Sequence, residues 1–154
     1  YHKAAALTDR KALRSAASFD GRGNGPELAA KFPANSEDGT KLNNHLKGFA
    51  ALSSASLSDQ DIVARHGGES FAMILQDRDL MSSYNLLVKI KHAFKTGAHA
   101  RPDGGAPVSG ATASFGIARY EPGMSARELI AQASSYLEDA KRSGRNLVKA
   151  KGIA

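Results

Sequence analysis

The chain has 154 residues, 42% of them hydrophobic, which suits one globular domain with a single core and excludes a disordered chain. It contains no cysteine, which excludes disulfides, thiolate metal sites and cysteine nucleophiles and fits a reducing cytoplasm. No apolar run approaches the roughly 20 residues that a membrane-spanning helix needs.

The formal net charge of +6 favours anionic partners such as nucleotides, nucleic acid or acidic proteins. A lysine-rich soluble surface explains the same charge equally well. Because the few aromatic residues are not interleaved with basic ones, we do not expect a nucleic-acid partner. The chain begins at Tyr1 without an initiating Met, so we expect residues 1–154 to be a single domain cut from a larger multidomain, cytoplasmic protein.

The N-terminal third is predicted to be mainly helical. Residues 4–17 are rich in alanine with a weak apolar pattern, which predicts a first helix. The glycine-rich residues 19–27 lack the spacing of a phosphate-binding loop and are interpreted as a connection. A second, amphipathic helix is predicted over residues 37–56, and the lone His45 within it is interpreted as packed or exposed, not as a metal ligand.

Residues 61–75, DIVARHGGESFAMIL, predict a β-hairpin. Two short β-rich runs flank His66 to Glu69, and the second run, Phe71 to Leu75, is continuously apolar, as in a central strand. A long helix is predicted over residues 77–97, ending at Gly97.

The C-terminal third predicts a strand, a helix and a strand. Residues 98–110 are interpreted as a loop, and residues 111–120 alternate in the manner of a strand. The residues expected on one face of that strand are Ala113, Phe115 and Ile117, and those on the other are Thr112, Ser114 and Gly116.

Ser125 and Glu128 form a capping box that opens the last helix. Its expected buried stripe consists of Leu129, Ile130, Ala133, Tyr136, Leu137 and Ala140. Gly144 ends this helix, and residues 145–150 predict a final strand. Strands separated by helices that must cover a sheet predict an α/β (α+β) fold with a mixed central β-sheet flanked by helices.

Three blocks in this order resemble the GGDEF domains of the diguanylate cyclase family. They are the hairpin DIVARHGGESFAMIL, the strand TASFGIA and the helix end AKRSGRN (residues 140–146). The segment ALTDRKAL (residues 6–13) is also similar to the family's entry helix. The resemblance implies a nucleotidyl-cyclase-like fold and a dimer that condenses two GTP molecules into cyclic di-GMP with Mg²⁺.

The hairpin carries a degenerate signature, GGESF in place of GGDEF. By resemblance, Gly67 and Gly68 form the turn at the nucleotide, where a Cβ would hinder close approach. Glu69 matches an acidic position that is catalytic and binds metal in the family. Ser70 replaces the family's Glu, and a hydroxyl carries no negative charge for a metal ion. The resemblance therefore implies weakened catalysis.

Lys141 and Arg145 match the basic pair that holds the GTP phosphates in the family. Their i, i+4 spacing is expected to place them on one side of the helix end. Favourable charge at a helix C-terminus explains the same residues without a ligand. In the same helix, Ser134 stands where the family has Asp.

Two further family features are altered. The family's acidic first strand was sought in residues 25–42, where no apolar strand ending in acids is found. In the family's inhibitory Arg-x-x-Asp site, Asp61 is kept but Ser58 replaces the Arg. Bidentate contacts from that Arg to cyclic di-GMP would be lost.

The sequence thus favours a catalytically inactive GGDEF domain that acts as a regulatory module in cyclic di-GMP signalling, beside an adjacent sensor or phosphodiesterase domain. An active diguanylate cyclase and a GTP-binding allosteric domain without turnover are the alternatives. GTP, cyclic di-GMP and a second copy of the chain are the expected partners, with Mg²⁺ as the cofactor if nucleotide binds.

Overall fold

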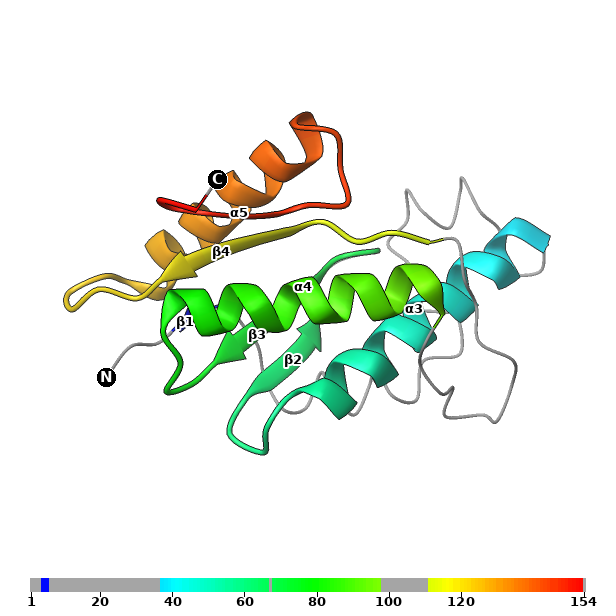
Figure 1. The fold of residues 1–154 in the computed structure, drawn as a ribbon, viewed down its shortest axis with the longest axis horizontal. Coiled ribbons are helices and arrows are strands. Elements are labelled where there is room, and N and C mark those ends of the chain that lie inside the picture. The colour runs from blue at the N-terminus through cyan, green and yellow to red at the C-terminus, as the bar shows by residue number, and fades with distance from the viewer. Residues whose placement is uncertain (1–3, 6–36, 67, 98–110, 154) are drawn as a thin grey trace.

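The computed structural model describes residues 4–5, 37–66, 68–97 and 111–153. The elements follow the order β1 (Ala4–Ala5), α3 (Glu37–Ser56), β2 (Ile62–Arg65), β3 (Phe71–Leu75), α4 (Leu80–Thr96), β4 (Phe115–Arg119), α5 (Ala126–Arg142) and β5 (Val148–Ala150) (Figure 1). From Glu37 onward, this is the predicted succession of helices and strands. In the described ranges, no helix is long and apolar enough to cross a membrane.

The strands form one five-stranded mixed sheet in the order β2-β3-β1-β4-β5. β2 pairs with β3 and β1 pairs with both β3 and β4, all antiparallel, whereas β4 and β5 are parallel. The parallel pair is connected by α5, as a parallel crossover requires. The predicted mixed α/β (α+β) fold is confirmed.

The predicted helix over residues 4–17 is wrong at its start, because Ala4 and Ala5 form β1. Ala4 lies opposite Leu75 of β3 and Arg119 of β4, which places β1 in the centre of the sheet. Alanine favours helices when isolated, but a central strand gains hydrogen bonds on both sides. The rest of that prediction, the loop over residues 19–27 and the loop over residues 98–110 lie outside the described residues.

The main core lies between α3, α4 and one face of the sheet. Phe49 of α3 contacts Phe71, Phe94 and Phe115 with ring centroids 4.8 to 6.0 Å apart. Ile90 of α4, 1% exposed, is buried in the same cluster. These aromatic contacts fix both helices against β3 and β4.

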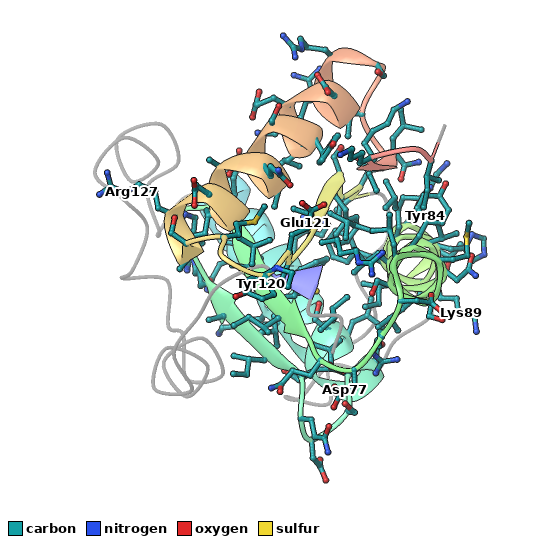
Figure 2. The ribbon with its side chains drawn as sticks, turned by 90° about the vertical axis from the view of Figure 1, so that its left-hand side faces the viewer. Asp77, Tyr84, Lys89, Tyr120, Glu121 and Arg127 are labelled. Atoms are coloured by element: carbon teal, nitrogen blue, oxygen red, sulfur yellow. The ribbon has the colours of Figure 1, made fainter. Side chains whose placement is uncertain are left out.

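The opposite face of the sheet is covered by α5, and Figure 2 shows α4 and α5 on opposite sides of the strands. Ala118 packs against Leu129 and Ala133 there. α5 begins at the predicted capping box, in which Ser125 and Glu128 exchange side-chain and backbone hydrogen bonds. Leu129, Ala133 and Ala140 of the expected stripe are buried, and Ile130, Tyr136 and Leu137 are half-buried.

Gly116 of β4 lies directly beneath α5. A Cβ at this residue would lie 2.1 Å from the carbonyl oxygen of Ala133 and 2.2 Å from the amide nitrogen of Leu137. Both neighbours are backbone atoms and cannot rotate away, so glycine is required for helix and strand to approach this closely.

Candidate functional site

The hairpin between β2 and β3 presents the GGESF residues at its tip. The last strand pair is Arg65 opposite Phe71, and the His66 amide donates a 2.7 Å hydrogen bond to the Ser70 carbonyl. The Arg65 guanidinium donates to the carbonyl of Gly68. These contacts hold the exposed Glu69 and the half-buried Ser70 at a defined place. Gly67 lies outside the described residues.

The second part of the candidate site is the turn that follows α5. The helix ends at Arg142 with Ser143 as its C-cap. Gly144, Arg145 and Asn146 then all have positive φ, at 115°, 61° and 52°. Arg145 therefore lies in the turn after α5, as the predicted end of the helix at Gly144 implies.

Hydrogen bonds at two points define the Arg145 turn. The Arg145 amide donates to the Ala140 carbonyl at 3.0 Å, which ties the turn to α5. The Asn146 amide donates to the Ser114 hydroxyl at 3.0 Å, which ties it to the segment before β4. Left-handed conformations are costly for residues other than glycine, so these contacts hold Arg145 in a conformation that it would not adopt in isolation.

One cavity of about 580 Å³ brings the two parts together. The predicted site residues that line it are Glu69, Ser70, Lys141 and Arg145. Its other polar lining includes His45, His66, Thr112, Ser114, Ser134 and Glu138. The volume lies within the range of small-molecule sites, and residues about 70 positions apart in the sequence converge on it. The roles predicted for these residues remain predictions.

The charges around the cavity are two carboxylates and two strong cations among its described lining residues. Lys141 pairs with Glu138 at 2.8 Å, and their side chains are 43% and 59% exposed. Such an exposed pair contributes little free energy, so Lys141 can exchange Glu138 for a ligand anion. The exposed Arg145 forms no ion pair with another residue that the structure describes.

The described lining residues do not fit a divalent metal centre by themselves. Mg²⁺ prefers oxygen ligands in near-octahedral geometry, usually with one or two carboxylates and phosphate oxygens. Nowhere in the described ranges do three His, Asp or Glu side chains gather as a possible metal site. At the cavity, Glu138 is engaged by Lys141, which leaves Glu69 as the carboxylate available to a metal.

The second predicted site, at Ser58 and Asp61, forms a hydrogen-bonded cluster at the open end of the hairpin, where β2 begins and β3 ends. The Asp61 side chain is fully buried and accepts from Arg78 at 2.7 Å. It also accepts from the Ser58 amide and hydroxyl at 2.9 and 2.8 Å, and from the Gln76 amide at 2.9 Å. Asp61 thus joins the turn before β2 to the end of β3.

Burial by itself raises the pKa of Asp61, since it disfavours the charged carboxylate. The hydrogen bonds from Arg78, Ser58 and Gln76 outweigh burial and hold this pKa below its ordinary value. The ionised carboxylate therefore stabilises the folded state.

Several residues of these two clusters could not be assigned from the sequence. Arg78 and Gln76 contact Asp61 across 17 and 15 positions, and no local spacing reveals that contact. His66 lies directly before the two glycines, and its position beside the turn was the signal that could have included it. His45 is half-buried, with its ring 6.4 Å from that of Phe94, as expected for a packed histidine.

The position of β1 bears on the search for the family's acidic first strand. The family's acidic first strand was sought in residues 25–42, but the strand between β3 and β4 is Ala4–Ala5. Residues 25–36 lie outside the described residues, so the expected lack of an acidic strand over residues 25–42 remains a prediction. The replacement at Ser70 stands independently of it.

Known structures with the same fold are GGDEF domains. The coiled coil and GGDEF domain of DgcB from Caulobacter crescentus, in complex with c-di-GMP, has 20% identity and a TM-score of 0.61, covering 97% of this chain and 68% of that one. An active GGEEF domain of a diguanylate cyclase from Vibrio cholerae has 16% identity and a TM-score of 0.59, with coverages of 99% and 83%.

The diguanylate cyclase SiaD from Pseudomonas aeruginosa, in complex with its activator SiaC, has 19% identity and a TM-score of 0.61, with coverages of 97% and 49%. At these identities the likeness establishes the fold alone. No curated protein matches the chain. The family model for the diguanylate cyclase GGDEF domain matches residues 41–147, more than half of the sequence and both sides of the cavity, and the chain therefore belongs to the GGDEF domain family.

Proposed function

We propose that this domain is a catalytically inactive GGDEF domain with a regulatory role in cyclic di-GMP signalling. The main support for this proposal is Ser70, which lines the same cavity as Glu69, Lys141 and Arg145. Joining two GTP molecules requires a 3′-hydroxyl to attack an α-phosphate, with metal ions to activate the one and neutralise the other. A serine hydroxyl can hydrogen-bond to a nucleotide but supplies no charge to hold those ions.

A second candidate is GTP binding without turnover. The cavity supports it, since Lys141 and Arg145 face a volume large enough for a small ligand and Arg145 has no described ion-pair partner. Guanidinium and ammonium groups are the usual partners of phosphate oxygens. Nucleotide bound in this way would act as an allosteric input to a neighbouring domain.

We do not propose product inhibition by cyclic di-GMP at Asp61. Both carboxylate oxygens of Asp61 already accept hydrogen bonds, and Ser58 itself supplies two of the donors. A ligand guanine would have to displace these internal contacts. The proposed partners are instead a second copy of the chain and an adjacent sensor or phosphodiesterase domain in the cytoplasm. SiaD, with its activator, illustrates regulation of such a domain by a protein partner.

Product chromatography after incubation with GTP and Mg²⁺ tests the inactive assignment, and we expect no cyclic di-GMP. Its formation by the wild type, with loss in Glu69→Ala, would contradict the proposal. Calorimetric titration with GTP and with cyclic di-GMP tests the ligand role. Binding of GTP supports an allosteric input, and binding of neither leaves regulation through protein contacts.

A further inference from the structure

The polar side chains that line the cavity suit an anion better than a metal ion. Its polar lining combines Lys141 and Arg145 with hydroxyl groups from Ser70, Thr112 and Ser134. Ammonium, guanidinium and hydroxyl groups all donate hydrogen bonds to phosphate oxygens. Mg²⁺ usually binds through one or two carboxylates together with phosphate oxygens, and of the two carboxylates among the described lining residues, Glu138 is paired with Lys141.

The charged side chains of the lining also favour an anion. Lys141 pairs with Glu138 at 2.8 Å, and among the described lining residues the carboxylates of Glu69 and Glu138 are matched in number by the cations of Lys141 and Arg145. Ser70 adds no charge next to Glu69. In a site rich in carboxylates, a polyphosphate needs Mg²⁺ to screen the repulsion, whereas the cations and carboxylates of the described lining residues balance before any metal is added.

The turn that carries Arg145 is built to keep its position. Its backbone is held at both ends, by the Ala140 carbonyl and by the Ser114 hydroxyl, in a conformation that favours glycine. A residue that serves only as a surface charge has no need of this conformation. The turn thus places an exposed guanidinium, with no ion-pair partner among the described residues, where it lines the cavity and can pair with a ligand anion.

We infer that the cavity binds the polyphosphate of GTP without a divalent cation, through Arg145, Lys141 and the serine hydroxyls. The inference rests on the proposed nucleotide-binding role and specifies its chemistry. The nucleotide then acts as a signal independent of Mg²⁺, and the missing metal prevents turnover. Both properties follow from Ser70 at the hairpin tip. Without the negative charge of the family's Glu, the site repels phosphate less and holds a metal ion less well.

Isothermal titration calorimetry with GTP, in EDTA and in MgCl₂, tests the inference directly. We expect comparable affinities in the two buffers for the wild type. Ser70→Glu should weaken binding in EDTA by roughly tenfold, because it places a like charge beside the phosphates, and Mg²⁺ should restore that loss. Binding of GTP by the wild type only in MgCl₂ would overturn the inference.

Arg145→Gly and Arg127→Ala form a matched pair of arginine variants. Arg145→Gly removes the guanidinium from a turn whose φ suits glycine, and we expect GTP binding in EDTA to fall by about tenfold or more. Arg127 extends outward from the first turn of α5, away from the cavity, so Arg127→Ala should bind as the wild type does (Figure 2). Equal losses in both variants would indicate general charge attraction and would contradict a site at Arg145.

Metal-free GTP binding and catalytic inactivity can be refuted independently of each other. Absence of GTP binding in both buffers would refute metal-free binding, yet leave catalytic inactivity untouched. Formation of cyclic di-GMP would refute inactivity whatever the binding experiments give.

Discussion

Arg78 donates a 2.7 Å hydrogen bond to the carboxylate of Asp61, whose side chain is completely buried. By resemblance of sequence, Asp61 matches the acid of the family's inhibitory Arg-x-x-Asp site. In this chain its oxygens are instead satisfied by Arg78, by Ser58 and by the Gln76 amide. Asp61 therefore has a structural role, because it joins the start of β2 to the residues that follow β3.

Asp61→Asn should destabilise the fold markedly. The amide keeps the size of the side chain but loses the charge that Arg78 requires, and its NH₂ group cannot accept from the Ser58 or Gln76 donors. We expect a loss of about 2–4 kcal/mol in the free energy of unfolding, measured by urea denaturation. Asp77→Asn, at an exposed neighbouring residue, serves as the control and should cost less than about 0.5 kcal/mol. Equal effects of the two substitutions would contradict the structural role of Asp61.

The contribution of Asp61 should also depend on pH. Its pKa in the folded state is lowered, so its stabilisation is present above the unfolded-state pKa and is lost as the pH falls through the folded-state pKa. The difference in unfolding free energy between wild type and Asp61→Asn should therefore be constant near neutral pH and shrink in acid. Urea titrations from neutral pH to about pH 3 measure it, and a difference that grows in acid would reverse the assigned direction.

Gly116→Ala should be strongly destabilising, because the new Cβ would meet backbone atoms of α5 at 2.1 and 2.2 Å. We expect a loss of about 3 kcal/mol or more, as in overpacked cores, together with displacement of α5. Gly123→Ala is the matched control. Gly123 has φ +90° with nothing within 4 Å of a Cβ, so its cost of about 1 kcal/mol reports backbone strain alone. A difference near zero between the variants, by thermal or urea unfolding, would contradict the close contact.

Arg145→Gly should leave the fold at least as stable as the wild type. Its φ of 61° is unfavourable for arginine and suits glycine, so relief of strain offsets the greater freedom of glycine in the unfolded chain. We expect a change between zero and about +1 kcal/mol in urea denaturation. A loss above about 1 kcal/mol would show that the arginine side chain stabilises the fold and is not held under strain for a ligand.

Local signals in the sequence predicted most of the fold. The spacing of Leu42, Leu46 and Phe49 predicted α3 over its observed residues, and the capping box at Ser125 marked the start of α5. The apolar run at Phe71–Leu75 predicted a strand that is flanked on both sides in the sheet. In each case the deciding interactions join residues close in sequence, which periodicity and capping rules describe well.

Features decided by distant residues were not predictable in the same way. Ala4 and Ala5 have high helix propensity, but hydrogen bonds to β3 and β4 decide their conformation. The turn at Arg145 depends on Ser114, which lies 32 positions from its partner Asn146. Lys141 lies in the last turn of α5, whereas Arg145 follows the left-handed Gly144, at which the sequence predicted the end of the helix. Both cations line the same cavity as Glu69 and Ser70.

The most direct test of the central claim is a product assay at the hairpin tip. Wild type and Glu69→Ala are incubated with GTP and Mg²⁺ at matched protein concentrations, and cyclic di-GMP is quantified by chromatography. We predict no product from the wild type or from Glu69→Ala. Cyclic di-GMP formed by the wild type and abolished in Glu69→Ala would contradict this prediction, because Ser70 would then be compatible with catalysis.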